Sequence, residues 1–235
     1  MSAIALPVLK TFEQSDELVA VLAQRIADAL QAAVDSRGQA SLVVSGGSTP
    51  VPLFHKLRTM PIDWQEVYIT LADERWLPAD HADSNERLVR EHLLVGNAAK
   101  AKFRGMYNIH GTPEAGAAMT AETLSNLPRP FDVVILGMGN DGHTASLFPC
   151  SEELQAGLTT EAVCLAVRPT TAPHPRLSLS LHSLLNARQI YLHLSGESKK
   201  AVLDEALSSK DVMAMPIRAV LDQRKVPVDV YWSKA

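Results

Sequence analysis

Apolar positions along the chain repeat with two spacings, one typical of helices and one typical of buried strands. In residues 15–38, apolar side chains recur at every fourth position from Leu18 to Leu30, which predicts a helix that ends near Gly38. Short runs rich in β-branched and apolar residues predict strands at 40–45, 66–73, 131–137, 162–168 and 189–195. Helical patterns between these runs predict further helices near 50–59, 84–95, 113–125 and 197–208.

This alternation predicts an α/β fold with a mostly parallel, Rossmann-like sheet that helices cover on both faces. A chain of 235 residues, of which 46% are hydrophobic and 20% charged, can bury one large core, so we expect a single domain over residues 1–235. The segment "RPTTAPHPR" (168–176) predicts a loop that is too short and too embedded to separate two domains. Ligands of such sheets gather beyond the carboxyl ends of the strands, so a site is expected in the loops that follow them.

The net charge argues against two classes of partner. With 22 Lys and Arg against 26 Asp and Glu, the formal net charge is −4, so we expect no binding to nucleic acid or to a membrane surface. We also expect no signal peptide and no membrane span, because no suitable apolar run is present. Cys150 and Cys164 lack metal-type spacing, which is typical of a reduced cytoplasmic protein. The chain is compatible with a monomer or a small homo-oligomer.

The first loop that follows a strand, "SGGSTP" (45–50), has the composition of an anion site. Gly46 and Gly47 allow a tight turn that points backbone N–H groups outward. Ser48 and Thr49 add hydroxyl donors, and Pro50 suits the first position of a helix whose positive dipole end would face the loop. The loop lacks the lysine of a Walker motif, so it does not indicate a nucleoside triphosphate. An ordinary glycine-rich turn with a serine or threonine cap is the alternative.

The next such loop, "DERWLPADHADSNERL" (73–88), groups charged and amide side chains. Asp73 and Arg75 stand where a predicted strand ends, and Asn85 stands at the start of a predicted helix. Carboxylate and amide groups there can bind the hydroxyl groups of a polyhydroxylated ligand. A solvated charged loop is the alternative. The acidic and histidine side chains at 80–83 also suggest a metal site, although clustered ligands on one loop define no coordination geometry.

The stretch "VVILGMGNDGHTASLFP" (133–149) contains the G-x-G-x-x-G spacing of a dinucleotide-binding turn. That fold needs a full helix after the glycines and an acidic residue at the end of the next strand. Here Pro149 leaves room for barely two helical turns after Gly142, and Arg168 stands at the end of the next predicted strand. We therefore expect no NAD or NADP site.

The same turn carries a histidine and a carboxylate that suit acid–base chemistry. His143 can act as a general base near neutral pH, and Asp141 can orient either the imidazole or a substrate. A structural histidine is the alternative. Arg176 in "PHPRLSLSL", and Lys199 or Lys200 in "SGESKKAVL", supply cations for an anionic ligand. A serine hydrolase is disfavoured because G-x-S-x-G is missing, and no context marks Cys150 as a nucleophile.

Five strings in this order resemble the 6-phosphogluconolactonase family: "SGGSTP", "ADERWLP…DSNERL", "GMGNDGHTASLFP", "PHPRLSLSL" and "GESKKAV". This family forms one superfamily with the glucosamine-6-phosphate isomerases/deaminases. The resemblance runs from about residue 40 to 205, and its most specific part is the G-x-G-x-D-G-H-x-A-S-L-F-P string. It implies a three-layer α/β/α domain that needs no cofactor and no metal. It also implies hydrolysis of 6-phospho-D-glucono-1,5-lactone to 6-phosphogluconate in the oxidative pentose phosphate pathway.

The resemblance further implies a role for each site residue. His143 would be the base that activates water and then returns the proton to the ring oxygen, and Asp141 would position His143 or the sugar. Arg75 would lie near the developing negative charge or serve the phosphate. The residues implied to bind the substrate and its phosphate are Gly46, Gly47, Ser48, Thr49, Asp73, Asn85, Arg176 and Lys199, with Lys200 as the alternative to Lys199.

Two other functions remain open from the sequence, an amino sugar phosphate isomerase/deaminase and a sugar-phosphate-sensing regulator. Against a regulator, no DNA-binding segment is visible, and Asp141 and His143 are both intact. In the deaminase branch the related string places a Glu five residues beyond the motif histidine, and Phe148 holds that position here. A phenyl ring cannot carry a proton, so we expect Phe148 to pack the wall of the pocket with Leu147.

Overall fold

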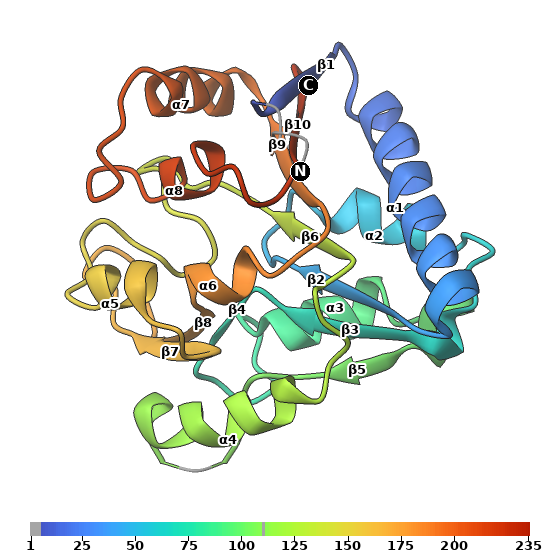
Figure 1. Cartoon of the computed structure of the whole chain (residues 1–235), viewed down its shortest axis with the longest axis horizontal. Helices are drawn as coiled ribbons and strands as arrows, with labels where there is room; N and C mark the ends of the chain where they lie inside the picture. The colour runs from blue at the N-terminus through green and yellow to red at the C-terminus, as the bar shows by residue number, and fades with distance from the viewer. Residues whose placement is uncertain (1–5, 110) are drawn as a thin grey trace.

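A seven-stranded parallel sheet forms the centre of the computed structural model, which describes residues 6–109 and 111–235 (Figure 1). The order of its strands is β1-β10-β9-β6-β2-β3-β5, and each neighbouring pair is parallel. The strands are β1 (Val8–Phe12), β2 (Ala40–Val44), β3 (Val67–Leu71), β5 (Lys102–Arg104), β6 (Val133–Leu136), β9 (Ile190–Ser195) and β10 (Val228–Ser233). The mostly parallel sheet predicted from the sequence is confirmed.

Helices cover both faces of this sheet and complete the three layers that the resemblance implied. In Figure 1, α1 and α2 lie on one side of the strands, and α7 and α8 lie on the other. None of the helices among the described residues has the length and apolar character needed to cross a bilayer. The helices are α1 (Ser15–Arg37), α2 (Val51–Leu57), α3 (Asn85–His92), α4 (Pro113–Ser125), α5 (Leu154–Thr159), α6 (Leu181–Leu184), α7 (Glu197–Leu207) and α8 (Arg218–Leu221), with 3-10 turns η1 (Trp64–Glu66) and η2 (Gly96–Lys100).

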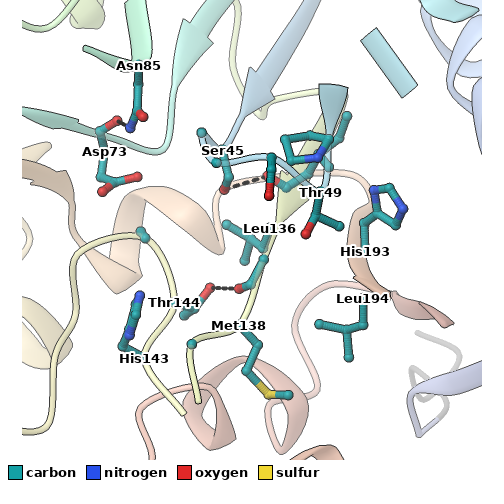
Figure 2. Close-up of a pocket in the computed structure, with 18 of the residues that line it drawn as sticks. Ser45, Thr49, Asp73, Asn85, Leu136, Met138, His143, Thr144, His193 and Leu194 are labelled. Atoms are coloured by element: carbon teal, nitrogen blue, oxygen red, sulfur yellow. Dashed lines mark hydrogen bonds between the residues drawn. The ribbon is translucent and has the colours of Figure 1, made fainter. Parts of the chain in front are cut away.

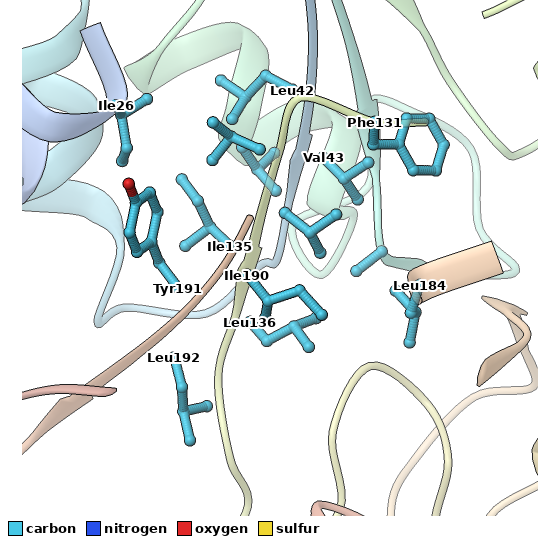
Figure 3. Packing of buried hydrophobic residues seen from close by; sticks show 14 of the residues in the cluster. Ile26, Leu42, Val43, Phe131, Ile135, Leu136, Leu184, Ile190, Tyr191 and Leu192 are labelled. Carbon is cyan, nitrogen blue, oxygen red and sulfur yellow. The ribbon is translucent and has the colours of Figure 1, made fainter. Parts of the chain in front are cut away.

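The predicted apolar stripe of α1 packs on the sheet and forms one side of the core. Its residues from Leu18 to Leu30 that repeat every four positions are fully buried. Figure 3 shows Ile26 of α1 with Tyr191 and Ile135 of the sheet, and all three belong to one buried cluster. Every residue of β2 and β6 is buried, which explains why these strands, apart from Ser41 of β2, are made of apolar residues.

A second, smaller sheet departs from the prediction. Strands β4 (Asp73–Arg75), β8 (Arg176–Leu179) and β7 (Cys164–Val167) pair antiparallel in the order β4-β8-β7. The run 162–168, which the sequence placed with the strands of the large sheet, belongs here through β7. A short apolar run carries no signal for the sheet that it joins, because its partners lie far away in sequence.

The order of the strands places a crevice at one edge of the large sheet. Starting from β2, strands β3 and β5 extend the sheet on one side, whereas β6, β9, β10 and β1 extend it on the other. The connections after β2 and β6 therefore leave the carboxyl edge in opposite directions. Ligands of open α/β sheets bind in the crevice that such a reversal creates.

Candidate active site

A cavity of about 350 Å³ opens at this edge of the sheet (Figure 2). The loops after β2 and β6 and the carboxyl ends of β6 and β9 build most of its wall, together with β4, Lys199 of α7 and the first residues of α3 and β8. Asp141, one of the residues that the sequence assigned to a site, reaches the cavity through its contact with His143. The other assigned residues line the cavity directly: Gly46, Gly47, Ser48, Thr49, Asp73, Arg75, Asn85, His143, Arg176 and Lys199.

The loop after β6 holds His143 and Asp141 as a hydrogen-bonded pair. Nδ1 of His143 lies 2.6 Å from Oδ1 of Asp141, and the backbone N–H of His143 donates to the same oxygen at 3.1 Å. An ionised carboxylate only accepts, so Nδ1 is the donor, and in the neutral form of the imidazole this leaves the lone pair on Nε2. Partial burial by itself raises the pKa of Asp141, but the hydrogen bond and the charge of His143 hold this pKa below its ordinary value. The pair has the arrangement of an oriented general base.

The glycines of this loop form a closed turn around the histidine. The N–H of Gly139 donates to the carbonyl oxygen of His143 at 2.8 Å, and the next helix, α5, begins only at Leu154. A Cβ atom on Gly139 would lie 2.0 Å from Nδ1 of His143, so a glycine is needed there to make room for the imidazole. The turn thus replaces the crossover helix that a dinucleotide-binding fold requires.

The loop between β2 and α2 presents the donors of the predicted anion site. Gly47, Ser48 and Thr49 are exposed at the cavity. Helix α2 begins at Val51, so Pro50 precedes the helix instead of being its first residue. A Cβ atom on Gly46 would lie 1.9 Å from the amide oxygen of Asn85. This close approach holds the loop against the start of α3.

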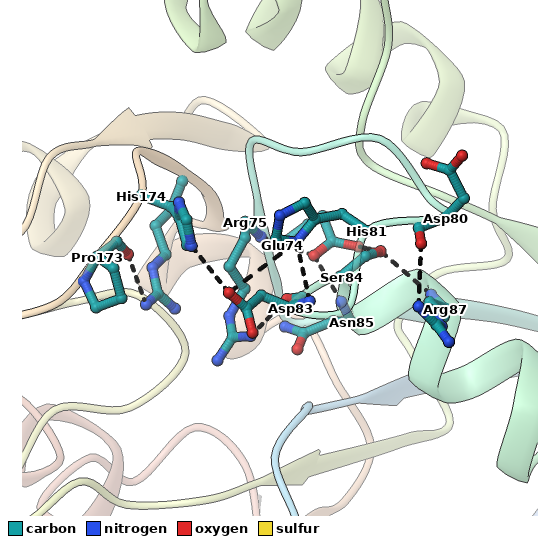
Figure 4. A network of polar contacts seen from close by, with 11 residues as sticks. Glu74, Arg75, Asp80, His81, Asp83, Ser84, Asn85, Arg87, Pro173 and His174 are labelled. Carbon is teal, nitrogen blue, oxygen red and sulfur yellow. Dashed lines mark hydrogen bonds and ion pairs between the residues drawn. The ribbon is translucent and has the colours of Figure 1, made fainter.

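Glu74 anchors the start of α3, a role that the sequence did not reveal (Figure 4). Its carboxylate accepts hydrogen bonds from the backbone N–H groups of Asn85 at 2.8 Å and Glu86 at 2.7 Å, and from the hydroxyl of Ser84 at 3.1 Å. Burial raises the pKa of Glu74 to about 7, although these backbone hydrogen bonds act to lower it. The amide of Asn85 donates in turn to the carbonyl oxygen of Asp73 at 2.9 Å, so Glu74 positions two residues of the cavity wall.

The residues at 80–83, where the sequence suggested a metal site, connect their own loop to the loop before β8 (Figure 4). The carboxylate of Asp83 lies 3.0 Å from Nε2 of His174, in the loop before β8. Arg75 donates to the carbonyl oxygen of Asp83 at 2.5 Å, and Nδ1 of His81 accepts the N–H of Asp83 at 3.0 Å. In residues 6–109 and 111–235, no group of three or more His, Cys, Asp or Glu residues is arranged to hold a metal ion.

Two arginines from neighbouring strands line the cavity together. Arg75 of β4 and Arg176 of β8 are direct partners in the antiparallel register. Arg176 is buried, which lowers its pKa, while the nearby charge of Asp73 opposes that shift; Nη1 of Arg176 lies 3.7 Å from Oδ2 of Asp73. Within the described residues, the buried Nε of each arginine has no hydrogen-bond partner. Like charges at one register position repel, which favours an anionic ligand between them.

Lys199 and Lys200 point in different directions. The sequence could not decide which of the two meets a ligand. Lys199 lines the cavity, and its Nζ donates to Oδ1 of Asn140 at 2.6 Å. Lys200 pairs with Asp204 one turn further along α7, at 2.5 Å. Of the two, Lys199 is therefore the cation that a ligand in the cavity can meet.

His193 on β9 is a cavity residue that the sequence analysis missed. It is only 3% exposed, and neither ring nitrogen has a hydrogen-bond partner among the described residues. In Figure 2 it lies on the Thr49 side of the cavity, whereas His143 lies on the Asp73 side. A histidine inside the buried run "QIYLHLS" gives no signal of its own, because the run is recognised by its apolar residues.

Replacing His193 by leucine is expected to remove a part of the acid sensitivity of the fold. Burial lowers the pKa of His193 from 6.5 to about 4. Between these values the unfolded chain binds more protons than the folded one, so stability falls as the pH drops from 6.5 towards 4. The free energy of unfolding of His193→Leu minus that of the unmutated protein should therefore be about 2 kcal/mol larger at about pH 5 than at about pH 7.5. Urea denaturation at both pH values measures it, and a difference independent of pH would contradict it.

Comparisons with known proteins agree with this arrangement. The family described as glucosamine-6-phosphate isomerases/6-phosphogluconolactonase matches residues 13–232. A curated relative from Pseudomonas putida, named 6-phosphogluconolactonase, is 46% identical over 237 residues, covering 99% of this chain and 96% of the relative. One from Pseudomonas aeruginosa with the same name is 42% identical over 226 residues, covering 95% and 94%.

Solved structures show the same relationship. The crystal structure of a 6-phosphogluconolactonase from Shewanella baltica has a TM-score of 0.96 at 63% identity, covering 99% of this chain and 100% of the other. A monomeric glucosamine-6-phosphate deaminase has a TM-score of 0.81 at 18% identity and covers 96% and 97%, which shows a shared fold. The chain belongs to the glucosamine-6-phosphate isomerase/6-phosphogluconolactonase family, and the resemblance stated from its motifs is confirmed.

Proposed function

We propose that the protein hydrolyses 6-phospho-D-glucono-1,5-lactone to 6-phospho-D-gluconate, a step of the oxidative pentose phosphate pathway, with His143 as the general base. The names of the relatives and the family description support this substrate and this reaction. One observation carries the mechanism: the His143–Asp141 pair borders the same cavity as the cationic side chains of Arg75, Arg176 and Lys199.

In this mechanism Nε2 of His143 accepts a proton from a water molecule while the water oxygen bonds to the carbonyl carbon of the lactone. The bond from that carbon to the ring oxygen then breaks, and the imidazolium gives the proton to the ring oxygen. The neutral imidazole is regenerated, so one histidine serves both steps. Asp141 keeps the proton on Nδ1 and stabilises the imidazolium, and Arg75 stabilises the oxyanion. A lactone is an activated ester, so no covalent intermediate is required.

The phosphate group serves as an anchor at some distance from the carbonyl. We assign it to the loop 45–49 with Arg176 and Lys199, and we assign the sugar hydroxyl groups to Asp73 and Asn85. Binding energy from a remote dianion fixes the carbonyl against His143. A phosphorylated substrate does not cross a lipid bilayer unaided, so we place the reaction in the cytoplasm, where phosphorylated sugars are formed.

The test is an assay with freshly prepared 6-phospholactone, followed in a pH-stat or by coupling to oxidation of the product. Turnover well above spontaneous hydrolysis is the expected result, and a rate no faster than buffer alone would overturn the proposal. Incubation with glucosamine 6-phosphate tests the other branch of the family. Release of ammonia and fructose 6-phosphate at a comparable rate would place the protein in that branch instead.

Replacing Lys199 by alanine is expected to raise KM for the 6-phospholactone about 10-fold to 100-fold, because a hydrogen bond between charged groups contributes about 1.5–3 kcal/mol. Lys200→Ala, one residue away and paired with Asp204, is the matched control and should change KM less than about threefold. Initial rates with the phosphorylated lactone and with unphosphorylated gluconolactone measure the effect. Equal losses on both substrates would instead indicate a structural role for Lys199.

A further inference from the structure

The ring of Phe148 stacks on the imidazole of His143. The two ring centroids are 4.1 Å apart, and the ring planes differ by 30°. Phe148 is 2% exposed, so this contact is buried, whereas the side chain of His143 is 30% exposed. Phe148 is not among the described residues that line the cavity. The sequence analysis expected it in the pocket wall, but it lies behind that wall, against His143. Whatever Phe148 contributes to the site therefore acts through the cavity residues that it contacts, and His143 is one of them.

The same phenyl ring contacts a second residue of the site. The guanidinium carbon of Arg176 lies 5.4 Å from the centroid of the Phe148 ring, and Arg176 also pairs with Asp73. An arginine near an aromatic face is attracted by the ring quadrupole. One buried side chain thus lies against both the base, from the loop after β6, and a cation of the cavity, from strand β8.

Two contacts are needed to fix the direction of Nε2 on His143. The hydrogen bond to Asp141 holds Nδ1, but a single hydrogen bond leaves the ring free to rock about that atom. A flat ring stacked on the imidazole restricts its plane.

We propose that Phe148 is a positioning residue for His143, which holds the plane of the imidazole so that Nε2 points at the reacting water, and which ties it to Arg176. The inference rests on the proposed lactone hydrolysis. Misplacing a catalytic group by about 1 Å costs up to about 100-fold in rate. Phe148→Leu is therefore expected to lower kcat about 10-fold to 100-fold with KM within about threefold, and Phe148→Tyr, which keeps the aromatic face, should restore most of the rate.

Phe103→Leu is the matched control. Phe103 on β5 is a partly buried phenyl ring that also has an arginine over its face, with the Arg90 guanidinium carbon 5.1 Å from the ring centroid, but it does not line the cavity. Losing this ring should lower thermal stability without the large loss of kcat. Thermal unfolding of the variants at 148 and 103 shows how much of any rate change follows from folding. Equal kcat losses in Phe148→Leu and Phe103→Leu would overturn the proposal.

A measurement on the unmutated protein keeps the test independent of both turnover and folding of variants. NMR of the histidine rings should show His143 with its proton on Nδ1 and with ring order comparable to that of the backbone. A freely rocking or tautomerically mixed ring in the unmutated protein would overturn the proposal. If the protein fails to hydrolyse the lactone while this ring is rigid, the proposed function falls, whereas the restriction of the His143 ring by its packing stands.

Discussion

Replacing His143 by alanine is expected to lower kcat for the 6-phospholactone by about two to four powers of ten, the range for a positioned acid–base group. The physical reason is that Nε2 of His143 carries the lone pair, while Nδ1 is committed to Asp141 at 2.6 Å. The remaining cavity still binds the substrate, so KM should change far less than kcat. Stopped assays corrected for spontaneous hydrolysis measure both constants.

His182→Ala is the control for this experiment, because His182 is an exposed histidine on α6 that does not line the cavity. It should turn over the lactone at the rate of the unmutated protein. A folded His143→Ala protein with nearly unchanged kcat would remove the imidazole from the mechanism. Asp141→Asn adds a second check, since an amide in place of the carboxylate no longer enforces a proton on Nδ1 and should lower kcat with the fold retained.

The strands next to the site could be predicted from sequence because of where they lie. Strands β2 and β6 are buried on both faces, so apart from Ser41 their residues are apolar and stand out from the chain. The loops after them were recognisable because the chemistry is local. A tight turn with outward N–H groups needs a glycine, as at Gly47 with its φ of +91°, and an oriented base needs a carboxylate a few residues from a histidine, as at Asp141 and His143.

The outer strands could not be predicted from their own residues. Strand β1 (Val8–Phe12) lies at the edge of the sheet and leaves Val8 and Leu9 exposed, so it lacks the pattern of a half-buried strand. It pairs with β10 (Val228–Ser233) from the other end of the chain, and β10 in turn pairs with β9, so both pairings join segments that lie far apart in sequence. Strand β5 (Lys102–Arg104) is too short for any period to appear.

Contacts between distant segments explain what the sequence left out of the site. The pairing of β4 with β8 sets Arg75 opposite Arg176, and no local pattern records that pairing. The stacking of Phe148 on His143 spans only five residues, but it depends on the turn made between them. Local chemistry therefore identified most of the residues, whereas their relative placement required the folded chain.

Replacing Arg176 by leucine is expected to lower the free energy of unfolding by about 3 kcal/mol, because it leaves a buried carboxylate without its cation. The side chains of Arg176 and Asp73 are each 8% exposed, with Nη1 and Oδ2 3.7 Å apart. The hydroxyl of Ser146 donates to the same oxygen of Asp73 at 2.5 Å, so one partner remains and the loss stays below that of an isolated buried charge. Urea denaturation of the two proteins measures the difference.

Two further variants decide whether the cost comes from the unpaired charge. Adding Asp73→Asn to Arg176→Leu removes that charge, so the double variant should recover a part of the lost stability and show a coupling energy of about 1 kcal/mol or more. Arg168→Leu is the matched control, because Arg168 and Glu114 form an ion pair in which both side chains are about half exposed, and such pairs contribute about 0–1 kcal/mol. Similar losses for Arg176→Leu and Arg168→Leu, or additive effects at Asp73 and Arg176, would show that the buried pair adds nothing beyond packing.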